Sequence, residues 1–313
     1  MTFSKLLNPL IYASLCLIWG SSFILMKWGL YDAHNQVVLT AWQVAAIRVL
    51  SAGVVLIPFM VSKVGKLPRS LLPYVILSGF LGVFAPAFLF CIAETHIDSS
   101  LAGVLNALTP FCAILFGFLL YRAIVPARQI LGIIIGLGGL ILLFMAQGHV
   151  SYRNVGYAGY VILATICYGI NLNLVKNKLH DIPSITIATV SIVALVIPAA
   201  IILYGSGYFS LPLGNPVYIK STIASCILGV VGTALSWIIF FVLLKRTSPV
   251  FASSMTYIIP AVALGWGWYY GEAITAAQVV CMLIILAGVY LTNPLIKKKE
   301  IKPSQSSSRY SRP

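Results

Sequence analysis

The sequence predicts an all-helical membrane protein whose chain crosses the bilayer about ten times. Three observations carry this prediction: 60% of the 313 residues are hydrophobic, only 8% are charged, and the basic residues gather in short connections. A soluble domain carries about 25% charged residues. A chain this poor in charge must face lipid over most of its surface, where only internally bonded elements such as helices are stable.

Ten apolar stretches are long enough to be spans. A helix needs about 20 apolar residues to cross roughly 30 Å of hydrocarbon, because each residue adds about 1.5 Å. The first stretch has no small-residue cleavage site, so we expect it to be retained as a span. The predicted spans are residues 8–30, 36–61, 71–93, 98–120, 126–146, 155–176, 183–205, 217–243, 248–270 and 274–295.

The orientation follows from the basic residues. With the N-terminus in the cytoplasm, sixteen Lys and Arg residues fall on the cytoplasmic side and only Arg153 and Lys220 on the other. Cytoplasmic loops carry an excess of Lys and Arg, and one missed helix would reverse every later loop. We therefore expect a multi-pass protein of the plasma (inner) membrane with both termini cytoplasmic. Residues 297–313, rich in Ser and basic residues, are predicted to be a disordered cytoplasmic tail.

The two halves of the chain resemble each other at an offset of about 150 residues. The matched pairs are Gly79 with Gly229, Gly82 with Gly232, Pro110 with Pro260 and, at an offset of 149, Trp19 with Tyr168. Five spans per half is an odd number, so residues 1–150 and 151–296 are predicted to be inverted repeats. Such repeats are typical of alternating-access carriers, with the solute site near the midplane between them.

Several short motifs resemble a known family. They are Trp19-Gly20-Ser21-Ser22-Phe23 followed by Lys27, Arg48 in the second span, Thr109-Pro110 in the fourth, and Gly271-Glu272 after the ninth. With these residues the chain resembles the EamA family of the drug/metabolite transporter (DMT) superfamily over roughly residues 8–295. The resemblance implies ten helices around a central cavity, with the fifth and tenth helices at the periphery, and export of the solute.

Lys27 and Arg48 are the two basic residues well inside predicted spans. A charge in hydrocarbon is costly and marks either a function or an internal pair. Arg48 lies near the middle of its span. It either bonds backbone carbonyls or contacts an anionic or carboxylate-bearing solute. Lys27 lies near the outer end of the first span, so it either extends to the interface or contacts the solute.

Other polar and aromatic residues inside spans complete the candidate solute-binding set. For the polar ones the alternative is interhelical hydrogen bonding, and for the aromatic ones it is core packing. Pro110 and Pro260 are predicted to be paired gating hinges, because a proline inside a helix frees a carbonyl and kinks the helix. The further solute-binding candidates are Trp19, Ser22, Asn106, Tyr168, Asn171, Trp237 and Tyr257.

All six acidic residues and all four histidines fall at predicted span ends or in loops. The sequence therefore predicts either facilitated exchange or proton coupling through Glu94, Asp98 or Glu272, near the outer face. The six cysteines lie singly in apolar runs and read as small hydrophobic residues, so we expect neither a metal site nor a cofactor. The basic residues form no helical face, so we expect no nucleic-acid partner.

The leading interpretation is a carrier that exports a small organic metabolite, such as an amino acid or a similar zwitterion, by alternating access. A nucleotide-sugar or phosphate-ester exchanger is a second interpretation, although such solutes want more internal cations than Lys27 and Arg48. An intramembrane enzyme would need a nucleophile and base, or His and acidic residues, clustered at membrane depth. The sequence shows no such cluster, so we expect no enzyme. The oligomeric state, monomer or homodimer, stays open.

Overall fold

The structure is a computed structural model of the chain, and it describes residues 3–65, 67–146, 152–246, 255, 258–272 and 274–292. Within these residues the fold is helical, with a single isolated β-bridge between Tyr31 and Val37 and no strand. Seven helical stretches are long and apolar enough to cross a membrane, and they correspond to predicted spans one to four and six to eight. They are Leu10–Leu30, Ala41–Met60, Arg69–Ala93, Ser99–Tyr121, Gly156–Lys178, Ile185–Gly205 and Pro216–Phe240.

Several of these stretches consist of more than one helix. In the first half they are built from α1 (Phe3–Leu30), α2 (Ala41–Val64), η1 (Arg69–Leu71), α3 (Leu72–Gly79), η2 (Phe80–Phe84), α4 (Ala85–Ala93), α5 (Ser99–Asn106) and α6 (Thr109–Tyr121). In the second half they are built from α8 (Tyr152–Lys178), α9 (Ser184–Val193), α10 (Val196–Gly205), α11 (Pro216–Gly229), η4 (Val230–Leu235) and α12 (Ser236–Arg246). The 3-10 turn η3 (Tyr208–Ser210) joins α10 to α11.

The three remaining predicted spans correspond to apolar helices that the described residues cover in whole or in part. The fifth corresponds to the 20-residue helix α7 (Ala127–Ala146) and the tenth to α15 (Ala276–Thr292). Residues 248–254 and 256–257 of the predicted span 248–270 lie outside the described residues. Its described part is Met255 and residues 258–270, which include the 11-residue helix α14 (Ile259–Tyr269).

The second span begins later than predicted. Asn35 has a φ of 58°, in the left-handed region, and the Asp32 carboxylate accepts the backbone N–H groups of His34 and Gln36 at 2.9 and 2.8 Å. These bonds fold the connection into a compact turn, so α2 begins at Ala41 rather than at residue 36. Arg48 is therefore the eighth residue of α2 and lies about 10 Å from the start of this helix, closer to that end than the predicted span placed it.

Two π-helical segments interrupt the third and seventh of the long stretches, and they begin 150 residues apart. They are η2 and η4, and a glycine precedes each, Gly79 and Gly229. A Cβ on Gly79 would lie 2.6 Å from the backbone oxygen of Ser191, and one on Gly229 would strike the backbone oxygen of Arg48. Each segment thus depends on close backbone contact with a helix of the other half. Segments of this kind are rare and often lie at functional sites.

The glycines inside the two π segments also make matching contacts. The Asn171 amide lies against Gly82, 2.5 Å from where its Cβ would stand, and the Ser22 hydroxyl lies 3.0 Å from the same position on Gly232. Ser22 and Asn171 are themselves 149 residues apart, the offset found for Trp19 and Tyr168. Each half therefore places an equivalent polar residue against the equivalent glycine of the other half.

Pro110 and Pro260 begin helices instead of kinking them. The fourth predicted span consists of α5 and α6, separated by Ala107 and Leu108. Pro110 lies in the first turn of α6 and Pro260 in the first turn of α14. The missing N–H of a proline breaks no helical hydrogen bond in a first turn. The prediction that these prolines lie inside continuous helices was wrong, and each one instead marks a helix start.

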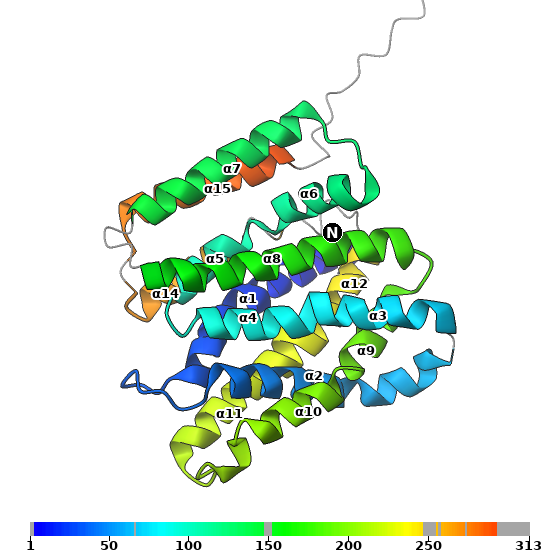
Figure 1. Cartoon of the computed structure of the whole chain (residues 1–313), viewed down its shortest axis with the longest axis vertical. Coiled ribbons are helices and arrows are strands. Elements are labelled where there is room, and N and C mark those ends of the chain that lie inside the picture. Colours follow the sequence, from blue (N-terminus) through cyan, green and yellow to red (C-terminus); the bar gives the residue numbers. More distant parts are fainter. Residues whose placement is uncertain are drawn as a thin grey trace, which may run out of the picture.

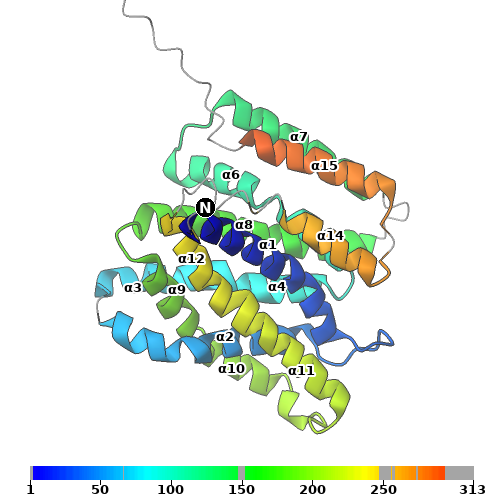
Figure 2. The same cartoon turned by 180° about the vertical axis from the view of Figure 1, so that it is seen from behind.

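The helices form a bundle with one peripheral pair. Helices α8, α3 and α4 lie nearest the viewer in Figure 1, and α1, α11 and α12 lie nearest in the reverse view of Figure 2. In both views α7 and α15 run side by side at one end of the molecule. Gly288 of α15 lies against the backbone of Gly132 and Gly136 of α7, and a Cβ on Gly288 would not fit there. This is the peripheral position that the family resemblance implies for the fifth and tenth helices.

Candidate functional site

Four charged residues gather where the two halves meet, and we call them the outer charge cluster: Lys27, Glu94, Asp98 and Glu272. Lys27 lies in the last turn of α1, and its Nζ is 3.4 Å from both Asp98 Oδ1 and Glu272 Oε1. Asp98 precedes α5 of the first half, and Glu272 follows α14 of the second half. Lys27 therefore links three helix ends and both halves of the chain.

Glu272 also caps a helix of the other half. Its Oε1 accepts the backbone N–H of Ser99 and its Oε2 that of Ser100, each at 3.1 Å. The first N–H groups of a helix have no acceptor within the helix, and its N-terminus attracts negative charge. The Glu272 side chain is only 9% exposed. Its carboxylate thus joins the turn after α14 to the start of α5.

Glu94 is the buried member of the cluster, with 1% of its surface exposed. Its Oε2 is 3.1 Å from Ser99 Oγ, which in turn is 3.3 Å from the backbone oxygen of Phe23. Its Oε1 has no hydrogen-bond partner among the described residues. Burial raises the pKa of Glu94 well above its usual value, although Lys27 and the Ser99 hydrogen bond act in the opposite direction.

Arg48 lies deeper, between the halves, and is half-buried. Its Nε donates to Thr233 Oγ1 of η4 at 3.0 Å, and its Nη1 lies 3.9 Å from Met26 Sδ of α1. In the described part of the chain, no carboxylate oxygen lies within 4.0 Å of Arg48, and it donates to no backbone carbonyl. A guanidinium carries five N–H donors, so most of them are left for another acceptor.

The aromatic candidates form two separate groups. Trp19 lies 6.4 Å from Trp237 and 5.4 Å from Phe240, measured between ring centroids, and these two rings are 6.0 Å apart. Tyr168 instead lies 6.3 Å from Phe90. Phe90 and Phe240 are 150 residues apart, so Trp19 and Tyr168 pack on matched phenylalanines instead of on each other.

The polar candidates differ in how fully they are bonded. Ser22 donates to the backbone oxygen of Ile18 at 2.9 Å within its own helix. Asn106 ends α5 and accepts from the Thr109 hydroxyl across the break before α6, through its backbone oxygen at 2.8 Å and its side chain at 3.4 Å. Asn171 is buried, and its Oδ1 has no partner among the described residues. Tyr257 lies outside the described residues.

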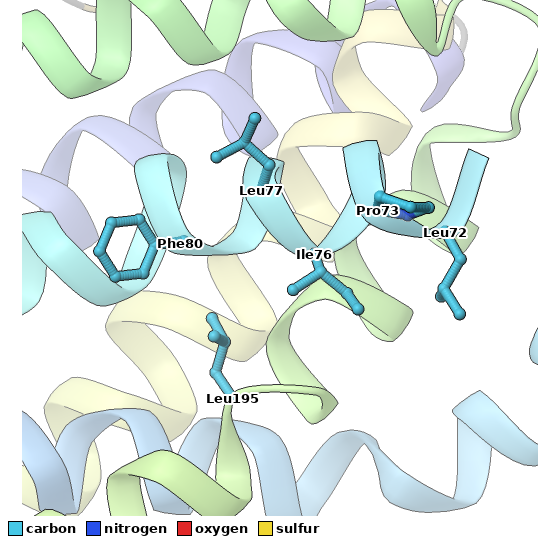
Figure 3. Close-up of a pocket in the computed structure, with 6 residues that line it drawn as sticks. All are labelled: Leu72, Pro73, Ile76, Leu77, Phe80 and Leu195. Carbon is cyan, nitrogen blue, oxygen red and sulfur yellow. The ribbon is translucent and has the colours of Figure 1, made fainter. Parts of the chain in front are cut away.

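Two of the hollows that the described residues form lie on the surface of the bundle. The larger, about 520 Å³, lies between α3 and the break before α10, and all its lining side chains are apolar (Figure 3). They are Leu72, Pro73, Ile76, Leu77, Phe80 and Leu195. The smaller, about 220 Å³, lies between α1 and η4 and is lined by Leu17, Ile18, Ser21, Leu25, Val231 and Gly232. The larger hollow offers no polar group to a solute, whereas the smaller lies beside the Ser22–Gly232 contact.

Comparison with known sequences now decides the family. A sequence model of the EamA-like transporter family matches residues 9–145 and 156–293. The chain belongs to the EamA-like transporter family. The family resemblance inferred from the motifs is thereby confirmed. This EamA-like chain is an integral, multi-pass membrane transporter of small molecules and not an enzyme.

The relatives are distant and extend over most of this EamA-like chain. An S-adenosylmethionine/S-adenosylhomocysteine transporter of Chlamydia muridarum is 24% identical, covering 80% of each chain. A probable amino-acid metabolite efflux pump of Salmonella typhimurium is 22% identical, covering 88% of this chain and 90% of the relative. The inner membrane transporter YedA of Escherichia coli is 25% identical, covering 93% and 92%.

A solved structure shares the fold of this EamA-like transporter. It is described only as a crystal structure of a protein, and it superposes with a TM-score of 0.59 at 16% sequence identity. The match covers 91% of this chain and 95% of the solved one. At this identity the likeness speaks for the fold alone.

Several residues of the site were not predicted from the sequence. Thr233, which accepts from Arg48, was not among the candidates, although it directly follows the matched glycine Gly232. Ser99 and Ser100, which hold Glu94 and Glu272, were also missed. Glu94 was expected at a span end, and its depth of burial was not foreseen.

Proposed function

We propose that this EamA-like chain is a secondary transporter of ten transmembrane helices, built as two inverted repeats and working by alternating access. The repeats are residues 1–150 and 151–296. The 150-residue offset between the π segments, and the matched contacts of Gly82 with Asn171 and of Gly232 with Ser22, support a two-fold relation between the halves. The two stretches matched by the family model support a duplication as well. Repeats of this kind place the solute site at their interface.

The orientation places both termini in the cytoplasm of the plasma (inner) membrane. Sixteen basic residues on one side against two on the other support it. In this orientation the outer charge cluster lies at the extracytoplasmic end of the bundle, and residues 297–313 form a cytoplasmic tail. Pro110 and Pro260, each at a helix start, are proposed to act as paired hinges.

The solute is a small metabolite that carries a carboxylate, such as an amino acid or a similar zwitterion. The single observation behind this assignment is Arg48, held between the halves by Thr233 and Met26 with no acidic partner in the described residues. A guanidinium binds a carboxylate through two parallel hydrogen bonds. Trp19 and Trp237 supply an aromatic surface for the apolar part of the solute.

The remaining candidates complete the proposed solute site. Asn171 offers an unpartnered buried oxygen, suited to an ammonium group. Lys27 is occupied by Asp98 and Glu272 in this conformation, so it would meet a solute only after those ion pairs separate. Ser22, Asn106, Tyr168 and Tyr257 stay in the proposed set as predictions. The relative named as an efflux pump supports export as the direction.

A nucleotide-sugar or phosphate-ester exchanger is the second candidate. Such a solute carries more negative charge than an amino acid and needs several cations in the cavity. Lys27 is already paired with two carboxylates, so of the two basic residues well inside the predicted spans only Arg48 has no acidic partner among the described residues. This favours the zwitterion.

Counterflow in proteoliposomes tests the proposal. Vesicles holding the purified chain are loaded with an unlabelled compound and exposed to a trace of its radiolabelled form, using phenylalanine, threonine, methionine, S-adenosylmethionine and UDP-glucose in turn. We expect transient accumulation of at least one of the four amino-acid-bearing compounds and none of UDP-glucose. Accumulation of UDP-glucose alone would establish the exchanger instead. No accumulation of any amino-acid-bearing compound would refute the assignment.

A further inference from the structure

We propose that Glu94 is a proton-binding residue that controls whether the outer charge cluster holds the two halves together. The direction of coupling rests on the proposed function, whereas the switch itself rests on geometry. The members of the outer charge cluster come from α1, from the turn between α4 and α5, and from the turn after α14. Opening the outer end must therefore break this cluster.

The hydrogen bonds around Glu94 fit its protonated form. Ser99 has one hydroxyl hydrogen and lies between Glu94 Oε2 at 3.1 Å and the Phe23 carbonyl at 3.3 Å. A protonated carboxyl donates to Ser99 Oγ, and Ser99 then donates to Phe23, so each atom in the row has a partner. An ionised carboxylate must take the Ser99 hydrogen, which leaves the Phe23 carbonyl without this donor.

The second oxygen of Glu94 strengthens the same conclusion. Oε1 is buried and has no partner among the described residues. A buried oxygen without a hydrogen bond is costly, and far more so when it carries charge. In this structure the outer end of the bundle is closed, and the Glu94 carboxyl is therefore neutral.

The charged neighbours of Glu94 explain how loss of its proton would open the outer end of the bundle. The charged and titratable groups that act on it are Lys27 from α1, Arg48 from α2 and Glu272 from the turn after α14, with Cys91 on α4 and Tyr31 after α1 also near. Of these, Lys27 makes the ion pairs that join the halves. When the proton leaves, Glu94 becomes a new anion competing for Lys27. Drawing Lys27 inward weakens its bonds to Asp98 and Glu272, and the outer end loosens.

One proton is bound and one is released over a transport cycle. In the outward-open form a proton from outside binds the Glu94 carboxylate and makes it neutral. Lys27 returns to Asp98 and Glu272, and the outer end closes. After the inner end opens, the proton leaves Glu94 to the cytoplasm, solute binds, and the inner end closes before the outer end opens. In an exporter this order exchanges one proton moving inward for one solute moving outward, so a zwitterionic solute is exchanged with one net positive charge moving inward.

The thiol of Cys91 reports opening without any solute. Cys91 lies one turn before Glu94 on α4 and is 0% exposed. The reporter protein keeps Cys91 and has its other five cysteines replaced by alanine. Right-side-out vesicles are treated with a membrane-impermeant methanethiosulfonate at a series of pH values. Each rate is divided by that of the unfolded protein at the same pH, because the thiolate fraction itself rises with pH.

We expect the corrected rate to rise with pH as Glu94 ionises. A difference of one pKa unit between the closed and open forms changes the opening equilibrium about tenfold, so a rise of about tenfold or more is expected. Glu94→Gln keeps the shape and cannot ionise, so its rate should stay low at every pH. A rise that survives in Glu94→Gln, or its absence in the reporter protein, overturns the proposal.

Asp98→Asn is the matched control. Asp98 also pairs with Lys27, but its side chain is 61% exposed. This variant should raise the rate at every pH and keep the step, and loss of the step would move the switch from Glu94 to Asp98. Infrared spectroscopy of the unmodified protein needs no variant. It should show a protonated carboxyl at neutral pH, and absence of that band also refutes the proposal.

The two proposals fail separately. If Cys91 labelling shows the step while counterflow finds no amino-acid-bearing solute, the switch stands and the solute assignment falls. If counterflow succeeds while labelling shows no step, the solute assignment stands and Glu94 has no role in opening.

Discussion

The two π segments follow matched glycines but differ in length and in chemistry. Both follow a glycine that touches a helix of the other half, Ser191 on α9 for η2 and Ser51 on α2 for η4. The fourth residue of each differs, however, since η2 has Val83 where η4 has Thr233. Thr233 accepts a hydrogen bond from Arg48. Ser51 and Ser191 make the corresponding glycine contacts and are 140 residues apart. At the same offset, the residue that corresponds to Arg48 is Ala188, which has no charge.

The features that recur in both halves therefore differ from those that occur in one half alone. The bends, close glycine contacts and helix starts recur in both halves, as a carrier that exchanges the roles of its halves requires. The arginine and its hydroxyl partner occur once. Under the proposed function, a repeated frame with one such arginine would give one solute site instead of two.

Arg48→Ala is expected to have the largest effect on transport. A hydrogen bond to a charged group is worth about 1.5–3 kcal/mol, so counterflow of the amino acid should fall about 10- to 100-fold. Arg48→Lys should retain part of the activity, because it keeps the charge without the planar fork. Lys220→Ala, at an exposed position on α11, is the control and should transport normally. Full activity in Arg48→Ala would remove Arg48 from the site.

The glycines before the π segments give the next largest effect, seen in stability. A Cβ at Gly229 would strike the backbone of Arg48 and the Ser51 hydroxyl, and one at Gly79 would meet the backbone of Ser191. Overpacking of this kind costs about 1–3 kcal/mol. Both Gly→Ala variants should lower the thermal unfolding midpoint, and Gly229→Ala should also impair transport by displacing Arg48.

Gly159→Ala is the control for these two variants, since a Cβ there meets nothing within 4 Å. It should unfold at the same temperature as the unmodified protein or higher, because alanine favours a helix over glycine. Equal destabilisation at all three glycines would show that the close contacts are not what matters.

Thr233→Val makes η4 like η2 and should have a moderate effect. It removes the acceptor of Arg48 Nε and nearly preserves the side-chain shape, a loss of about 0.5–1.5 kcal/mol. We expect KM for the amino acid to rise about threefold to tenfold, with Thr233→Ser restoring it. Val83→Thr, the matched change in η2, should leave KM unchanged. An equal rise in both variants would argue that the two segments are functionally alike.

The smallest effects are expected at Asn171 and Ser22, which lie against matched glycines. Ser22 already bonds Ile18, and a hydrogen bond inside a membrane averages about 0.6 kcal/mol, so Ser22→Ala should change KM by less than about threefold. Asn171 has an oxygen without a partner, so Asn171→Ala should raise KM more than Ser22→Ala does. The reverse order, measured by counterflow, would place the solute against Ser22.

The helices were predicted from hydropathy summed along the sequence, and such a sum does not detect short breaks or turns. Apolar runs located seven spans whose helices the structure describes. A sum over some 20 residues does not register a one-turn break, so the interruptions at Ala107 and Leu108 and at Ala194 and Leu195 were not foreseen. The late start of α2 depends on the left-handed turn at Asn35, which hydropathy does not record.

The site was predicted where charge stands out and missed where it does not. Arg48 and Lys27 were found because a cation in an apolar run is conspicuous. Thr233 and Ser99 were missed, since hydroxyl groups are common in membrane helices and usually bond their own backbone. The place of Glu94 along the chain indicated a span end. It gave no information about the tertiary contacts that bury this side chain.

The pairing of α7 with α15 has a consequence for biogenesis. The two helices are separated in sequence by residues 147–275, and synthesis at about 5–20 residues per second makes α7 wait on the order of 10 s for its partner. During that time the backbone of Gly132 and Gly136, which Gly288 later covers, has no α15 partner. A chain shortened before α15 would keep this glycine face open permanently, and α7 would be free to pair with the same face of a second copy.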